Sequence, residues 1–277
     1  MQESLYKRRR CGGNYDAPLI ITGCPRTGTS ALAQCLSRHA AMCVLPEACV
    51  YDLDDDYLAS RRSIVWDQLP FAVDSAARAA IDALPLGRLT NSEMRVVLFE
   101  AIGRMKPLQV YGDKLPQRYL DQMERLVRRF PHSRFIVTVR DGRDVIASQL
   151  RWHRERRRAG GSIEWWMRPS VAAAESVWLD CMRRWDRLRD RIAPDRWLEV
   201  RYERATAQPE AMLEDVCRFV GLPFGLDTFG DGLAHYEAVH VGQWRKELPD
   251  INTQASSTFR GALRRFGYES AAVARPA

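Results

Sequence analysis

The predicted fold depends on residues 19–30, which read Leu19-Ile20-Ile21-Thr22-Gly23-Cys24-Pro25-Arg26-Thr27-Gly28-Thr29-Ser30. The first three residues are apolar and predict a strand, and the two glycines bound a loop. A helix is expected next, to about Arg38, with its apolar residues on one stripe. In such a strand–loop–helix unit the unpaired N–H groups of the first helical turn point at the loop, so the sequence predicts an anion-binding site there.

The spacing of the two loop glycines, Gly-x4-Gly, also fits the P-loop template. That template demands a lysine at the position of Thr29, where it reaches the β- and γ-phosphates of a nucleotide. This loop carries its cation earlier, at Arg26, which suits a ligand with one phosphate and no triphosphate tail. The alternative is a turn that is rich in Gly and Thr for local reasons alone.

Bulk composition is that of one large soluble α/β domain over residues 1–277, with 46% hydrophobic and 28% charged residues. No apolar run is long enough to span a bilayer, and the basic arm at residues 1–17 lacks the apolar core of a secretory signal. We therefore expect a cytoplasmic enzyme with a flexible arm and a disordered tail at 270–277. The seven cysteines form no C-x-x-C pair and predict reduced thiols, and the five scattered histidines suggest no metal site.

The net charge of +7 predicts a surface that attracts anions. Of the 42 basic residues, only four are lysine: Lys7, Lys106, Lys114 and Lys246. A donor that carries several negative charges is a sufficient reason for a basic cleft, so nucleic acid is not required.

Polar residues follow several predicted strands. Glu47 comes after the apolar segment 42–45, Lys114 after a short strand that ends at Gly112, and Arg140 after the buried strand 135–139. Ligands of open α/β sheets bind outside the carboxyl ends of the strands, so Glu47 is expected on the same rim as Arg26. Asp141 and Asp144 are expected to cap the helix that follows Arg140.

Residues 50–105 are expected to form three helices, at 52–69, 74–84 and 91–105, with Asn91 as the N-cap of the third. This region departs most from known motifs, so we expect it to form a helical cap on the acceptor side of the cleft. Further helices are expected at 171–191, 209–220 and 259–268, and a last strand at 197–200.

The loop at 25–30 resembles the Pro-Lys/Arg-Ser-Gly-Thr-Thr loop of sulfotransferases that use 3′-phosphoadenosine 5′-phosphosulfate (PAPS). Four further elements resemble that family: Gly-Asp-Lys-Leu-Pro at 112–116, Arg140 with Ser148 eight residues later, Arg-Tyr-Glu at 201–203, and Gly-Gln-Trp-Arg at 242–245. The resemblance is greatest to the tyrosylprotein and bacterial branches. It implies a three-layer, P-loop-like α/β fold with a central parallel sheet flanked by helices.

The resemblance also implies the donor site. Arg26, Thr27, Gly28, Thr29 and Ser30 would hold the 5′-phosphosulfate, and Arg140 with Ser148 the 3′-phosphate. Tyr202 would contact the nucleotide, and Gly242, Trp244 and Arg245 belong to a loop that folds over it in relatives. The product would be adenosine 3′,5′-bisphosphate, and no metal is implied.

The implied catalytic residues are Glu47, Arg26 and Lys114. Glu47 lies 21 residues after Arg26, the spacing at which tyrosylprotein sulfotransferases carry their catalytic base. It would take the proton of an acceptor hydroxyl during in-line transfer, while Arg26 and Lys114 stabilise the charge that develops. The alternatives for Glu47 are a solvated loop glutamate, a salt bridge to a loop arginine, or a histidine acting as base in its place. Trp152 stands where some tyrosylprotein relatives place another phosphate-binding arginine.

Two other functions stay open. One is a P-loop phosphotransferase of the nucleotide-kinase kind, against which the missing loop lysine counts. The other is a nucleic-acid-binding module built on the basic run 151–158, which lacks interleaved aromatic residues. The run could equally be a solvated helix face or attract an anionic acceptor. The acceptor itself stays open among small molecules, carbohydrates, lipids and peptides.

Overall fold

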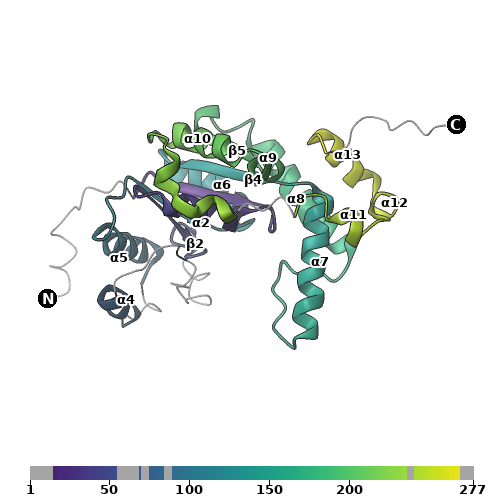
Figure 1. The fold of residues 1–277 in the computed structure, drawn as a ribbon, viewed down its shortest axis with the longest axis horizontal. Helices are drawn as coiled ribbons and strands as arrows, with labels where there is room; N and C mark the ends of the chain where they lie inside the picture. The colour runs from purple at the N-terminus through teal and green to yellow at the C-terminus, as the bar shows by residue number, and fades with distance from the viewer. Residues whose placement is uncertain (1–14, 55–68, 70–74, 84–88, 236–239, 269–277) are drawn as a thin grey trace.

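The computed structural model describes residues 15–54, 69, 75–83, 89–235 and 240–268. Within these residues the chain forms a five-stranded sheet whose strands all run parallel, in the order β2-β3-β1-β4-β5 (Figure 1). The strands are β1 (Leu19–Gly23), β2 (Met42–Pro46), β3 (Val110–Lys114), β4 (Arg134–Val139) and β5 (Trp197–Arg201). The predicted α/β fold with a central parallel sheet is confirmed.

Helices cover both faces of the sheet, because side chains alternate along each strand. Leu19 and Ile21 of β1 pack with α2 (Thr29–Arg38), α9 (Tyr202–Ala207), α10 (Pro209–Val220) and the 3₁₀ segment η4 (Leu226–His235). Ile20 packs on the opposite face with α5 (Asn91–Gly103), α6 (Arg118–Arg129), α7 (Gly142–Arg158) and α8 (Val171–Leu188). Two apolar cores therefore enclose the sheet in three layers, and polar groups can gather only at its edges.

Five further elements complete the described fold, and four of them add apolar residues to the core around Ile20. They are α4 (Ser75–Asp82), η3 (Pro194–Arg196), α11 (Trp244–Glu247), α12 (Ile251–Gln254) and α13 (Ser257–Arg265). Figure 1 shows α7 extending away from the sheet, with α11 and α12 beside it. No helix in the described ranges is both long and apolar enough to cross a membrane.

Several predicted boundaries were wrong. The third helix of the 50–105 region is capped by Thr90, whose hydroxyl accepts a hydrogen bond from the N–H of Glu93. Asn91 lies inside the helix, where its side-chain amide donates to the carbonyl of Asp52. Residues 52–54 are not helical, and residues 55–68 lie outside the described part of the chain.

The predicted arm and tail were tested only in part. Residues 1–14 and 269–277 lie outside the described ranges. Residues 15–17, which we had assigned to the flexible arm, are attached to the core instead. The ring of Tyr15 stacks on that of Phe99 and meets that of Tyr111 edge to face, and its carbonyl accepts a hydrogen bond from the hydroxyl of Tyr51. The last described helix ends at Arg265, three residues before the predicted end.

The close packing of the central strands gives a testable prediction. A methyl group added at Gly112 of β3 would collide with the backbone carbonyl of Leu19 in β1. Backbone cannot move aside within a sheet, so Gly112→Ala is expected to lower the free energy of unfolding by about 1–3 kcal/mol. Chemical denaturation measures the change. Gly103→Ala is the control, because a methyl there meets no atom within 4 Å; equal stability of the two variants would contradict the prediction.

Candidate functional site

All five strands deliver a polar residue to the same edge of the sheet, because parallel strands end on one side. The residues that follow or complete the strands are Arg26 after β1, Glu47 after β2, Lys114 at the end of β3, Arg140 after β4 and Tyr202 after β5. The sequence predicted each of these positions. The contacts below show which of the side chains the fold brings together.

The loop between β1 and α2 is rigid and shaped by its glycines. Gly28 is the N-cap of α2 and has φ 93°, and a Cβ atom there would lie 2.5 Å from the ring of Tyr202. The hydroxyl of Thr27 is buried, 2.7 Å from the carbonyl of Cys24 and 2.6 Å from the hydroxyl of Thr138. The side chain of Thr27 therefore holds the loop in shape, which leaves backbone N–H groups at the start of α2 as ligand donors.

Lys114 connects the loop to Glu47. Its ammonium donates to Glu47 Oε1 at 2.7 Å and to the hydroxyl of Ser30 at 3.0 Å. The Lys114 side chain is 2% exposed, whereas that of Glu47 is 44% exposed. Glu47 thus reaches solvent with one side fixed by a buried cation. The salt bridge expected for Glu47 was to a loop arginine, whereas its partner is Lys114.

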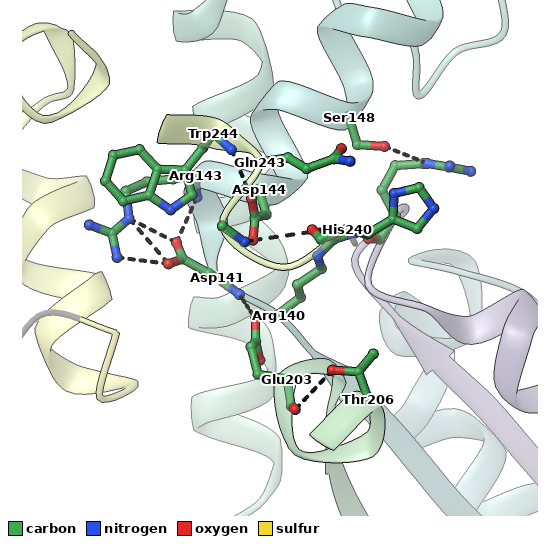
Figure 2. Close-up of polar contacts among 12 residues, drawn as sticks. Arg140, Asp141, Arg143, Asp144, Ser148, Glu203, Thr206, His240, Gln243 and Trp244 are labelled. Carbon is green, nitrogen blue, oxygen red and sulfur yellow. Dashed lines mark hydrogen bonds and ion pairs between the residues drawn. The ribbon is translucent and has the colours of Figure 1, made fainter. Parts of the chain in front are cut away.

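Arg140 crosses between two segments that are distant in sequence. Its guanidinium donates to the carbonyl of Arg26 at 3.1 Å and to the carbonyl of His240, and it lies 4.3 Å from the ring of Tyr202. Its Nε is buried and has no hydrogen-bond partner among the described residues. Figure 2 shows Arg140 beside the segment that carries His240.

Arg26 lies in an aromatic and strongly positive environment. Its Nε donates to the hydroxyl of Ser148 at 3.0 Å, and its guanidinium is 5.2 Å from the rings of both Trp152 and Trp166. Burial and the positive charges of Arg140 and Arg151 lower the pKa of Arg26 to about 10. The guanidinium is still charged at neutral pH, so an anion bound here would relieve its repulsion.

Ser148, which the sequence pairs with Arg140, is bonded to Arg26 in this structure. Arg140 is joined to the same loop through the carbonyl of Arg26. Trp152 occupies the position of the arginine that some relatives carry and contacts Arg26 through its ring. Trp166, in the segment between α7 and α8, contacts the same arginine through its ring.

Sequence reasoning missed the function of Asp144. We expected it to cap α7, but only Asp141 does so, accepting from the N–H of Arg143 at 2.9 Å. Asp144 accepts from the N–H groups of Gly242 at 2.7 Å and Trp244 at 3.0 Å (Figure 2). It thereby fixes the C-terminal segment against α7. The one sequence signal for this role was the position of Asp144 in the first turn of the helix, next to the edge of the sheet where Arg140 lies.

The ring of Trp244 is buried between two guanidinium groups. It lies 4.2 Å from that of Arg143 and 4.7 Å from that of Arg245. The predicted segment 242–245 is therefore placed at the rim by Asp144 and packed through its tryptophan. Direct contact of Gly242, Trp244 and Arg245 with a nucleotide stays a prediction.

The assembled edge presents cations and backbone N–H groups around one exposed carboxylate. Arg26, Arg140 and Lys114 are largely buried, and such cations favour phosphate or sulfate groups, with which arginine forms paired, charge-assisted hydrogen bonds. No group of three or more His, Cys, Asp or Glu side chains in the described part of the chain could hold a metal ion.

Comparisons with known proteins agree with this arrangement. The chain is 26% identical over 232 residues to protein-tyrosine sulfotransferase 1 of Danio rerio, a match that covers 81% of this chain and 57% of that protein. The chain thus spans little more than half the length of that relative.

Solved structures with the same fold include two sulfotransferase domains. The domain from the curacin biosynthetic pathway has a TM-score of 0.66 at 20% identity, covering 91% of this chain and 98% of that one. The domain from the olefin synthase of Synechococcus PCC 7002 has a TM-score of 0.66 at 19% identity, covering 92% and 95%. A model described as the sulfotransferase family matches residues 18–225, well over half of the chain. This protein therefore belongs to the sulfotransferase family.

Proposed function

We propose that this protein transfers a sulfuryl group from PAPS to an acceptor hydroxyl by in-line displacement. The observation that carries the proposal is the ion pair between Lys114 and Glu47, which places a candidate base and a buried cation beside the anion-binding loop. Family membership supports the transfer of a sulfuryl group. The loop without the P-loop lysine supports a donor other than a nucleoside triphosphate.

The residues present fit a donor with two separated anionic groups. Backbone N–H groups at the start of α2 and the hydroxyl of Ser30 lie beside the Lys114 ammonium, which suits the 5′-phosphosulfate. Arg140 offers a buried Nε without a hydrogen-bond partner, which suits the 3′-phosphate with help from Arg26 and Ser148. Tyr202 beside Arg140 would face the nucleotide. These assignments are part of the proposal.

The chemistry assigned to this chain is proton transfer and charge stabilisation. PAPS supplies the sulfuryl group when bound. Of the three candidate catalytic residues Glu47 is the exposed one, and it accepts the proton of the acceptor hydroxyl. Lys114 is held between Glu47 and Ser30, so its ammonium can stabilise negative charge on the transferring group and on the oxygen that leaves.

The acceptor is proposed only as a hydroxyl compound. Peptide tyrosine is one candidate, because a relative is a protein-tyrosine sulfotransferase. Small molecules, carbohydrates and lipids are the others. The helical region 50–105 stays the predicted source of acceptor specificity, although α5 within it is anchored in the core through Leu98, Phe99 and Ile102.

Donor binding is tested with adenosine 3′,5′-bisphosphate and calorimetry. Arg140→Ala removes a charged hydrogen-bond donor worth about 1.5–3 kcal/mol, so the dissociation constant is expected to rise about 10- to 100-fold. Arg218→Ala is the control, because Arg218 is an exposed arginine on α10. Absence of binding to the wild-type protein, or equal affinity of the two variants, would contradict the donor site.

The base is tested with Glu47→Gln, which keeps size and removes the proton acceptor. Turnover with a panel of phenol, sugar and peptide hydroxyl acceptors is expected to fall about 10²- to 10⁴-fold. Affinity for adenosine 3′,5′-bisphosphate should not change. Glu214→Gln removes an exposed carboxylate on α10 and should have full activity. Wild-type turnover of Glu47→Gln would exclude Glu47 as the base.

A further inference from the structure

Asp113, the neighbour of Lys114 at the end of β3, has a buried carboxylate to which the chemistry above gives no role. It is 0% exposed and accepts three hydrogen bonds. The donors are the N–H of Ala48 at 3.2 Å, the N–H of Val50 at 2.9 Å and the hydroxyl of Tyr119 at 2.6 Å. Two of the three donors thus belong to the turn that follows Glu47.

That turn has an unusual backbone. Glu47 and Cys49 both have φ 57°, a left-handed conformation that costs non-glycine residues roughly 1–2 kcal/mol each. The N–H groups of Ala48 and Val50 converge on one carboxylate, as successive backbone N–H groups do in anion-binding concavities. Here the bound anion is the side chain of Asp113 itself.

We propose that Asp113 is a positioning residue that fixes the carboxylate of Glu47 for proton transfer. The proposal rests on the function proposed above. Strand β3 holds the turn in three ways: Asp113 binds two of its N–H groups, the carbonyl of Lys114 accepts the N–H of Glu47 at 2.9 Å, and the Lys114 ammonium binds the Glu47 carboxylate. Glu47 is otherwise half exposed, so these contacts determine where its carboxylate lies.

Burying a carboxylate at the position of Asp113 is unfavourable in free energy. Burial raises the pKa of Asp113 to about 7, although the hydrogen bonds from Tyr119 and Val50 act in the opposite direction. An asparagine would offer one acceptor oxygen, and its NH₂ group would face an N–H donor. Asp113→Asn therefore keeps the shape of the side chain but releases part of the turn.

The first experiment compares two phenols of different acidity. One is a tyrosine peptide, whose hydroxyl has a pKa near 10 and requires a base; the other is 4-nitrophenol, used at a pH at which it is already ionised. Asp113→Asn is expected to lower kcat with the peptide about 10²-fold, as for a misplaced catalytic group. Its kcat with the nitrophenol and its affinity for adenosine 3′,5′-bisphosphate should stay within about threefold of wild type. Equal losses with both phenols would overturn the proposal.

Two variants separate positioning from general damage. Glu175→Gln changes another buried carboxylate, which binds Ser256 far along the chain, and is expected to retain activity with both phenols. In the Glu47→Gln background, Asp113→Asn should cost no further activity, because both changes disable the same proton transfer. Multiplicative losses would show that Asp113 acts independently of Glu47 and would overturn the proposal.

Amide hydrogen exchange tests the anchoring without any acceptor. Asp113→Asn should reduce protection of the Ala48 and Val50 amides, and retained protection overturns the anchoring. If that variant does not fold, Tyr119→Phe removes one donor to the same carboxylate and should give a smaller loss of kcat with the peptide. A fully active Glu47→Gln would refute the base assignment, whereas lost protection at Ala48 and Val50 would still support the anchoring.

Discussion

The parallel alignment of the five strands is the constraint on which the rest of the structure depends. It pairs Ile21 of β1 with Lys114 on one side and with Ile136 on the other, so all strands end at one edge. Both faces of the sheet are occupied by apolar cores. Polar chemistry is therefore confined to the carboxyl edge, where Arg26, Arg140 and Lys114 gather in spite of their mutual repulsion. Burial at this edge, together with the positive charges of Arg140 and Arg151, lowers the pKa of Arg26.

The positive charges of Arg26, Arg140 and Lys114 have partners within the protein, and these partners differ in how strongly they bind a cation. Lys114 pairs with a carboxylate, Glu47, at 2.7 Å, whereas Arg140 donates hydrogen bonds to the carbonyls of Arg26 and His240 and lies 3.9 Å from the carboxylate of Asp144. Arg26 has a hydroxyl and two aromatic rings. Arginine and phosphate commonly pair through two parallel hydrogen bonds between opposite charges, which a single neutral carbonyl cannot offer. A phosphate would therefore be a better partner for the two arginines than the groups they now contact. By the same reasoning, an anion bound beside Lys114 would gain little binding free energy as long as Glu47 is paired with the Lys114 ammonium.

The sequence was informative where chemistry follows local pattern. Apolar runs followed by Glu47, Lys114 and Arg140 predicted which residues reach the carboxyl edge, and the fold confirmed all three positions. Contacts over long separations were not predictable. Asp144 was expected to stabilise its own helix, because nothing near it in the sequence shows that Gly242, 98 residues later, returns to the same place. Periodicity identifies the buried face of a helix but not the distant segment that packs against it.

Several residues at the carboxyl edge have a strained backbone conformation. Within the described residues, the four non-glycine residues with positive φ are Arg26, Glu47, Cys49 and Gln117, and each follows one of the strands β1, β2 or β3. Such conformations persist only where other contacts determine them. The N–H of Glu47 is bound by Lys114, and the N–H of Gln117 by the carbonyl of Gly23 at 2.7 Å. The strained turns after β2 and β3 are thus each tied to a neighbouring strand, so the groups that they carry need little rearrangement when charge develops beside them.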